Sequence, residues 1–175
     1  MSNSLKGVEI FDVGTWNGYT FSDGDLNEIA SSFDELKLAG RVPLKFGHKG
    51  AMRGDDSQPA IGWVDTVYRK GSKLLADFVD IPTSVYDSIK KGLYKFVSVE
   101  LLDSVKAGTR TLPWVLDAVA LLGASRPAVS TLKDLKSLTY AHETLGLEYG
   151  AVKSFTRDSV INSMERHKMS NEDNG

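Results

Sequence analysis

Three residues of this chain, Ser98, His48 and Asp117, have the types needed for hydrolytic chemistry. A serine hydroxyl becomes a nucleophile when a base lies within hydrogen-bond distance, and histidine is a common base. A carboxylate that accepts the second imidazole N–H fixes the tautomer of that histidine, and these roles are recognised by geometry rather than by chain order. The sequence therefore contains the parts of a Ser-His-acid relay, although each part also has a simpler structural explanation.

His48 is the histidine best placed for such a role. It follows a short extended segment and opens a polar loop over 47–59, which we expect to be mobile and to order when substrate binds. His142 follows a short helix expected over 132–138, and His167 lies in a polar C-terminal segment, so only His48 falls inside the expected globular part. By itself, a histidine between glycines is more simply explained as a surface loop residue.

Ser98 lies in the middle of a strand expected over 94–102, where alternating side chains point to opposite faces. The simpler explanation for a hydroxyl at this position is a local hydrogen bond or exposure to water. The alternation places Val97, Val99 and Leu101 on one face, and Phe96, Ser98, Glu100 and Leu102 on the other.

Asp117 is the only charged residue in the apolar run 114–122, which we expect to be a buried strand. A buried carboxylate without partners costs several kcal/mol, so it must be paired or protonated. It could orient the imidazole of a catalytic histidine. It could equally be a structural carboxylate, bonded to backbone N–H groups or to Arg110 or Arg126.

The elements expected around these residues are mostly short strands. No regular βαβ alternation indicates a parallel doubly wound sheet, so the pattern favours an α+β or mainly-β fold, a mixed and mostly antiparallel β-barrel with flanking helices. The main expected elements are strands over 8–13, 42–46, 60–70, 74–79, 94–102 and 114–122, helices beginning near Ser22 and Pro82, a hairpin turn at Gly71–Ser72 and a turn over 105–109.

Length and composition restrict the class of protein. With 175 residues we expect one domain over 1–140 and a polar tail over 141–175, either flexible or the start of a truncated scaffold or linker region. The net charge of −2 gives no strong field for nucleic acid or anionic lipid. No apolar run approaches the ~18–20 residues that span a bilayer, and the N-terminus lacks a signal-peptide core. We therefore expect neither a nucleic-acid nor a membrane partner.

Familiar cofactor and metal motifs are absent from the sequence. There is no cysteine, which excludes disulfides and thiolate ligands and fits a reducing compartment. There is also no P-loop, no dinucleotide-binding glycine motif, no zinc-protease motif and no nucleophile-elbow motif. We expect no metal and no organic cofactor.

Several stretches together resemble the phage prohead (capsid maturation) proteases, specifically their Mu-like I protein branch. The resemblance covers roughly residues 7–137 and depends on the order and spacing of the whole set rather than on one motif. The stretches are Val42–Lys49, Ile61–Val64, Leu74–Phe78, Ile89–Gly92, Val97–Leu101 and Leu116–Val129.

The resemblance implies a serine endopeptidase with a fold similar to herpesvirus assemblin, a β-barrel wrapped by helices. It places the nucleophile at Ser98 and the general base at His48. The third position varies between families of this fold, and here the acidic residue of the final buried strand is Asp117. For the oxyanion, the candidates are Arg126 and a backbone N–H near Leu122–Gly123.

The resemblance also implies a biological role. Such a protease cleaves scaffold protein, and often itself, inside the procapsid, so the expected partners are scaffold and major capsid proteins, and a homodimer is also allowed. The expected location is the cytoplasm of a bacterial host, inside a phage procapsid or expressed from a prophage. Two alternatives remain: a catalytically inactive capsid-assembly or scaffold-associated module with the same fold, and a plain binding barrel.

Overall fold

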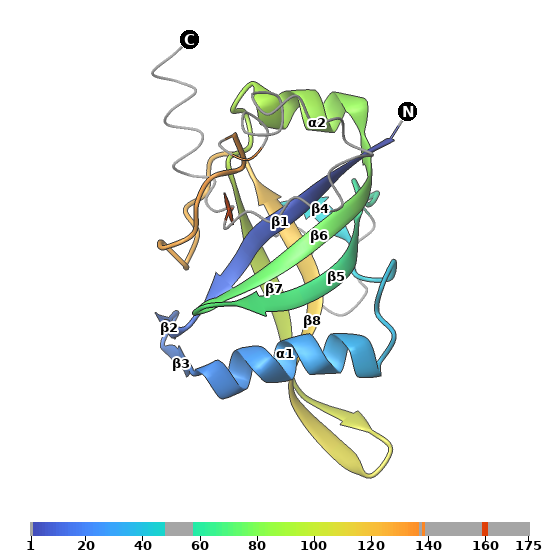
Figure 1. Ribbon diagram of the computed structural model, residues 1–175, viewed down its shortest axis with the longest axis vertical. Coiled ribbons are helices and arrows are strands. Elements are labelled where there is room, and N and C mark those ends of the chain that lie inside the picture. The colour runs from blue at the N-terminus through green and yellow to red at the C-terminus, as the bar shows by residue number, and fades with distance from the viewer. Residues whose placement is uncertain (1, 48–57, 137, 139–158, 161–175) are drawn as a thin grey trace.

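The computed structural model describes residues 2–47, 58–136, 138 and 159–160. Over these ranges the fold is mixed α+β and mainly β, with three small, mostly antiparallel sheets and two helices (Figure 1). The strands are β1 (Ser2–Asp12), β2 (Gly14–Trp16), β3 (Tyr19–Phe21), β4 (Leu44–Phe46), β5 (Trp63–Lys70), β6 (Lys73–Pro82), β7 (Phe96–Ala107), β8 (Arg110–Leu122) and β9 (Ser159–Val160), and the helices are α1 (Asp23–Glu35) and α2 (Thr83–Lys90).

The two larger sheets have the strand orders β5-β6-β1-β9 and β4-β8-β7. Two pairs, β1 with β9 and β4 with β8, are parallel, and the other described pairs are antiparallel. Backbone hydrogen bonds from Val64 to Val42 and from Leu44 to Gly62, both 2.9 Å, join the two sheets where β4 and β5 begin. The described strands nevertheless do not form a closed barrel, so the expected barrel is confirmed only as a mixed, mostly antiparallel β-rich fold.

Two tight hairpins follow directly from the local sequence. Gly71, with φ of +59°, and Ser72 connect β5 to β6, which confirms the expected turn. Asn17 and Gly18, with φ of +51° and +82°, connect β2 to β3. An Asn-Gly pair suits a two-residue turn that needs positive φ at both positions, so the local sequence also indicates this second hairpin.

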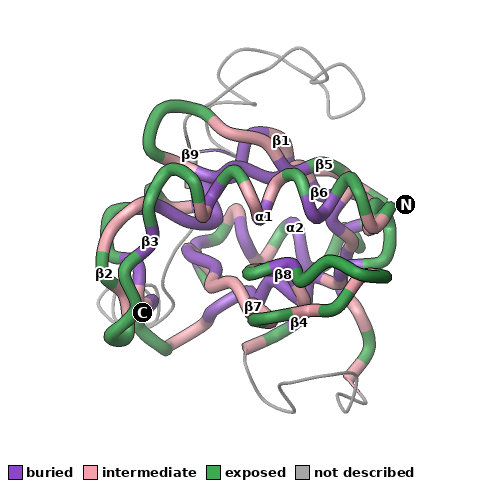
Figure 2. Tube along the Cα trace, turned by 90° about the horizontal axis from the view of Figure 1, so that it is seen from below, coloured by how far each residue is buried: buried purple, intermediate pink, exposed green. Residues whose placement is uncertain are grey.

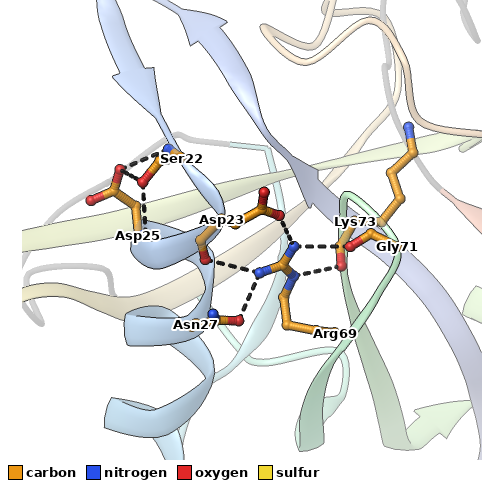
Figure 3. Close-up of polar contacts among 7 residues, drawn as sticks. All are labelled: Ser22, Asp23, Asp25, Asn27, Arg69, Gly71 and Lys73. Atoms are coloured by element: carbon orange, nitrogen blue, oxygen red, sulfur yellow. Dashed lines mark hydrogen bonds and ion pairs between the residues drawn. The ribbon is translucent and has the colours of Figure 1, made fainter.

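Helix α1 begins where the sequence indicated. The Ser22 hydroxyl accepts a hydrogen bond from the Asp25 backbone N–H, and the Asp25 carboxylate accepts one from the Ser22 N–H at 2.7 Å, which completes a capping box (Figure 3). The apolar face of the helix is buried at Leu26, Ile29 and Phe33 and packs against β8 and β5. Ser32, on the same buried face, donates a hydrogen bond to the Trp114 carbonyl of β8 at 3.0 Å.

Arg69 of β5 connects the β5–β6 hairpin to the first turn of α1 (Figure 3). Its guanidinium contacts the Asp23 carboxylate at 2.5 Å and donates to the Asn27 side chain at 2.7 Å. It also donates to the Gly71 and Lys73 carbonyls, at 2.9 and 3.1 Å. Because a guanidinium presents its donors in a fixed plane, these bonds fix the angle between helix and hairpin.

The main core lies between the larger sheets, α1 and α2, where Figure 2 shows the buried segments gathered in the interior. Helix α2 contributes Val85, Tyr86 and Ile89, as its apolar spacing predicted. The largest fully buried core side chains include Phe33, Phe78, Leu5, Ile10, Leu26 and Ile29.

The hairpin of β7 and β8 is longer than expected. The turn over 105–109 contracts to Gly108–Thr109, and both strands continue to that turn, so β7 reaches Ala107 and β8 begins at Arg110. The tip of this hairpin, over 106–111, is mostly exposed, whereas Leu112 just before the expected strand is fully buried. Most of the loop over 47–59 and of the tail over 141–175 lies outside the described residues, whereas Ser159–Val160 of the tail pairs with β1.

Candidate active site

Ser98 lies near the start of β7, an edge strand of the described β4-β8-β7 sheet, and is half-buried. Its register partner on β8 is Ala120, and the register partner of Ala120 on β4 is Lys45. Residues in register on neighbouring strands share a face of the sheet, so Ser98, Ala120 and Lys45 form one row. Val119 and Leu121, the β8 neighbours of Ala120, belong to the main core, so Ser98 lies on the face of the sheet opposite to theirs, in agreement with the predicted alternation.

A buried ion pair lies beside Ser98 on this face. Lys45 Nζ is 2.8 Å from Glu100 Oε2, and the two side chains are only 6% and 11% exposed. The pair bridges from β4 to β7 across β8, where Ala118 and Ala120 are small enough to leave room for the long lysine side chain. Neither charge was predicted to belong to a site. The sequence pattern that indicates a buried charge is the lysine inside the short apolar segment of β4.

His48 lies outside the described residues, but the chain leading to it is placed. Gly47 donates its backbone N–H to the Leu121 carbonyl at 2.9 Å, which continues the pairing of β4 with β8. Leu121 is in turn the register partner of Val97, the neighbour of Ser98. Residue 47 and the strand of Ser98 lie on opposite sides of β8. Since adjacent strands lie about 4.8 Å apart, residue 47 is about two strand spacings, roughly 10 Å, from β7.

Asp117 occupies a β-bulge of β8. Glu100 pairs with Ala118 and Leu101 pairs with Leu116, so Asp117 is the extra residue between two register pairs. It is half-buried, whereas the apolar run around it predicted full burial, because a bulge residue leaves the regular alternation. Asp117 stands three residues before the register partner of Ser98, so the two residues lie on adjacent strands.

The two arginines considered as partners of Asp117 have different positions. Arg110 forms an ion pair with Glu35 of α1, at the far end of β8, so it is not the partner of Asp117. Arg126 is exposed in the irregular segment that follows β8. Its assignment to the oxyanion stays a prediction.

A pocket of about 440 Å³ lies beside Ser98. Its volume is in the range of small-ligand pockets. The β7 residues that line it are Ser98, Val99, Leu101, Leu102 and Asp103. The aromatic residues that line it are Phe11, Trp16, Tyr19, Phe21 and Trp114.

Sequence reasoning missed this pocket because it missed the β2–β3 hairpin. The pair Asn17–Gly18, which stands between two aromatic residues, is the sequence pattern that indicates this hairpin. The turn places Trp16 and Tyr19 in the pocket wall. The Trp16 indole N–H donates to the Asp12 carbonyl at 2.9 Å, which fixes the orientation of the ring.

A polar cluster around Asp12 anchors the last wall of the pocket. The Asp12 carboxylate contacts Lys73 Nζ at 2.7 Å and accepts a hydrogen bond from the Thr131 hydroxyl at 2.6 Å. Lys73 also donates to the Thr131 carbonyl at 2.9 Å, and this holds the segment that brings Ala128 and Val129 to the pocket. Burial alone raises the pKa of Asp12, but the hydrogen bonds and the charge of Lys73 outweigh burial and lower that pKa below its usual value.

The described residues contain no group of three or more His, Asp or Glu side chains arranged to hold a metal ion. None of the helices that the structure describes is long and apolar enough to cross a membrane.

Comparison with known proteins gives no relative. No family model, no curated protein and no solved structure matches this chain.

Proposed function

We propose that this chain is a serine endopeptidase of the prohead protease type, which cleaves scaffold protein and itself during phage procapsid maturation. The observation that carries the proposal is the pocket beside Ser98, because it provides a binding space next to the hydroxyl that the resemblance designates as nucleophile. The finer fold proposed is assemblin-like, with the two larger sheets as parts of one barrel, and the backbone bonds between residues 42–44 and 61–64 support this.

The proposed chemistry is acyl transfer. His48 accepts the proton of the Ser98 hydroxyl, and the Ser98 oxygen attacks the carbonyl carbon of the scissile peptide. The imidazolium then donates that proton to the leaving amine, and a water molecule activated by His48 hydrolyses the acyl-enzyme. Asp117 orients the imidazole, and Arg126 or a backbone N–H near Leu122–Gly123 stabilises the oxyanion, a contribution of about 3–4 kcal/mol in such sites.

The arrangement of strands supports this assignment in two ways. Ser98 is on a strand whose position is fixed by an eleven-pair ladder with β8. The segment that leads to His48 is also hydrogen-bonded to β8, so one strand positions both sides of the site.

A fluorophosphonate probe tests the nucleophile without knowledge of the substrate. An activated serine oxygen displaces fluoride from phosphorus, so we expect one adduct on the wild-type chain, located at Ser98 by peptide mass spectrometry. Ser98→Ala should abolish the adduct, and His48→Ala should slow labelling at least a hundredfold. Ser88→Ala, which removes a half-buried hydroxyl of α2 that donates to the Ser84 carbonyl, is the matched control and should label normally.

Self-cleavage is tested by intact mass. We expect the wild type, but not Ser98→Ala, to lose a C-terminal fragment on incubation, with 147–150 the expected region of cleavage. A folded wild type that shows no adduct at Ser98 and no change of mass, also when incubated with its scaffold protein, refutes the protease and favours the catalytically inactive assembly module.

A further inference from the structure

The pocket beside Ser98 lies along an edge of β7. Side chains at successive positions of a strand point to opposite faces, yet Ser98 and Val99, and Leu101 and Leu102, all line the same pocket. A cavity bordered by both faces of a strand lies at the edge of that strand. The strand order β4-β8-β7 makes β7 an edge strand among the described residues, so no described strand is hydrogen-bonded to this side, although β1 packs near β7.

An edge strand can bind a peptide by strand addition. Its outward main-chain N–H and C=O groups pair with an extended chain, and pockets that receive alternate side chains provide specificity. Here the β2–β3 hairpin and the end of β1 form the wall that faces β7 across the pocket. An extended peptide on β7 therefore directs one side chain into this space.

The pocket wall selects for a large apolar side chain. The rings of Phe11 and Phe21 pack edge to face, with their centroids 4.7 Å apart. The ring of Trp114 packs against Phe21 and Tyr19, with centroid distances of 4.9 and 6.1 Å. Such aromatic clusters favour another ring or a branched aliphatic group. Apart from Ser98, which is half-buried, the polar lining residues Asn17 and Asp103 are exposed.

The wall is also preorganised. Trp16 is held by its hydrogen bond to Asp12, and its ring lies against Gly14, where an added Cβ would come within 2.7 Å of the indole. The φ of Gly14, +141°, is likewise suited to glycine. A binding wall that is fixed before the ligand arrives loses less conformational entropy on binding.

We propose that this pocket is a specificity site, which binds a large uncharged apolar side chain, aromatic or leucine-sized, of a peptide paired with the edge of β7. The proposal rests on the proposed function in taking that peptide to be the protease substrate. It adds a substrate class: extended segments with a bulky apolar residue near the scissile bond.

Binding is measured on the full chain carrying Ser98→Ala, so that no cleavage occurs. The probes are acetyl-Ala-Ala-Xaa-Ala-Ala amides with Xaa as Phe, Leu, Ala or Lys. We expect the Phe or Leu peptide to bind at least about tenfold more tightly than the Ala peptide. The indole N–H resonances of Trp16 and Trp114 should shift on binding, and that of Trp63 on β5 should not.

Two variants and a control locate the site. Ala128→Phe places a ring in the pocket without removing a core side chain and should abolish the preference for Phe or Leu over Ala. Tyr19→Ala removes a wall side chain that is 59% exposed, so folding should persist while affinity falls about three- to tenfold. Leu93→Ala removes a comparably exposed apolar side chain elsewhere and should change nothing.

The outcomes separate this inference from the proposed function. Equal affinity for the Phe, Leu and Ala peptides, tightest binding of the Lys peptide, or unchanged binding in Tyr19→Ala overturns the specificity site, whether or not Ser98 reacts with the fluorophosphonate. If the chain prefers the Phe or Leu peptide but its Ser98 does not react with the fluorophosphonate, the peptide-binding site is supported and only the proposed protease activity is refuted.

Discussion

The ion pair between Lys45 and Glu100 is expected to be a major determinant of stability. Lys45→Met keeps the length of the side chain and removes the positive charge that lies 2.8 Å from the Glu100 carboxylate, which is 11% exposed. Breaking a buried pair in this way costs about 3–5 kcal/mol of unfolding free energy. Because a domain of this size has about 5–15 kcal/mol in total, we expect the variant to fold with markedly reduced stability.

Urea unfolding at pH 7, followed by tryptophan fluorescence, measures this cost. Glu100→Gln should also destabilise, and the double variant should be less destabilised than the sum of the two single changes, with a coupling of about 1–3 kcal/mol. The matched control is the Arg110–Glu35 pair, whose side chains are 60% and 41% exposed. Arg110→Ala should cost less than about 1 kcal/mol.

Two results would refute the reasoning about Lys45 and Glu100. One is a cost below about 1 kcal/mol for both single variants, which would mean that water reaches the pair. The other is simple additivity in the double variant, which would mean that the two charges do not depend on each other.

The remaining predictions concern a carboxylate and a glycine. Since the pKa of Asp12 is lowered below its usual 3.8, its charge stabilises the fold above about pH 4, and this contribution is lost as pH falls through the lowered value. Asp12→Asn should therefore lower the free energy of unfolding by about 2 kcal/mol at pH 7, because it weakens the contact with Lys73. Near pH 2 the same substitution should cost much less. An equal cost at both pH values would contradict this prediction. Gly62→Ala should destabilise by about 2–3 kcal/mol, because φ is +150° and the new Cβ would lie 3.0 Å from Ile81. Gly24→Ala, on helix α1, is the control in the same thermal or urea assay, and equal stabilities of the two variants would contradict the prediction.

Local features of the fold were predictable because their causes are local. The capping box at Ser22 depends on residues three apart, and the Gly71–Ser72 turn depends on two adjacent residues. The alternation around Ser98 likewise follows from the period of a strand, and the register with Ala120 confirms which face it takes. The Asn17–Gly18 hairpin also has a local cause, because an adjacent Asn-Gly pair indicates such a turn, although the hairpin was not among the expected elements.

Features that depend on strand pairing were not predictable in this way. The apolar run of β8 predicted a fully buried Asp117, but a bulge is defined by two residues facing one on the partner strand, which no single segment reveals. Likewise, the ends of β7 and β8 were misplaced because their pairing, rather than their own apolar content, extends them to Gly108–Thr109.

The sequence by itself determined the residue types available for chemistry, the strand alternation that sets the face of Ser98, and the starts of both helices. These depend on neighbours within a few positions, where sterics and hydrogen-bond periodicity act directly. Only the tertiary structure decided that Lys45 and Glu100 meet across β8 beside Ser98, and that the hairpin at Asn17–Gly18 supplies an aromatic wall along β7. Those contacts join segments far apart in the chain, and their register is set by packing the whole core.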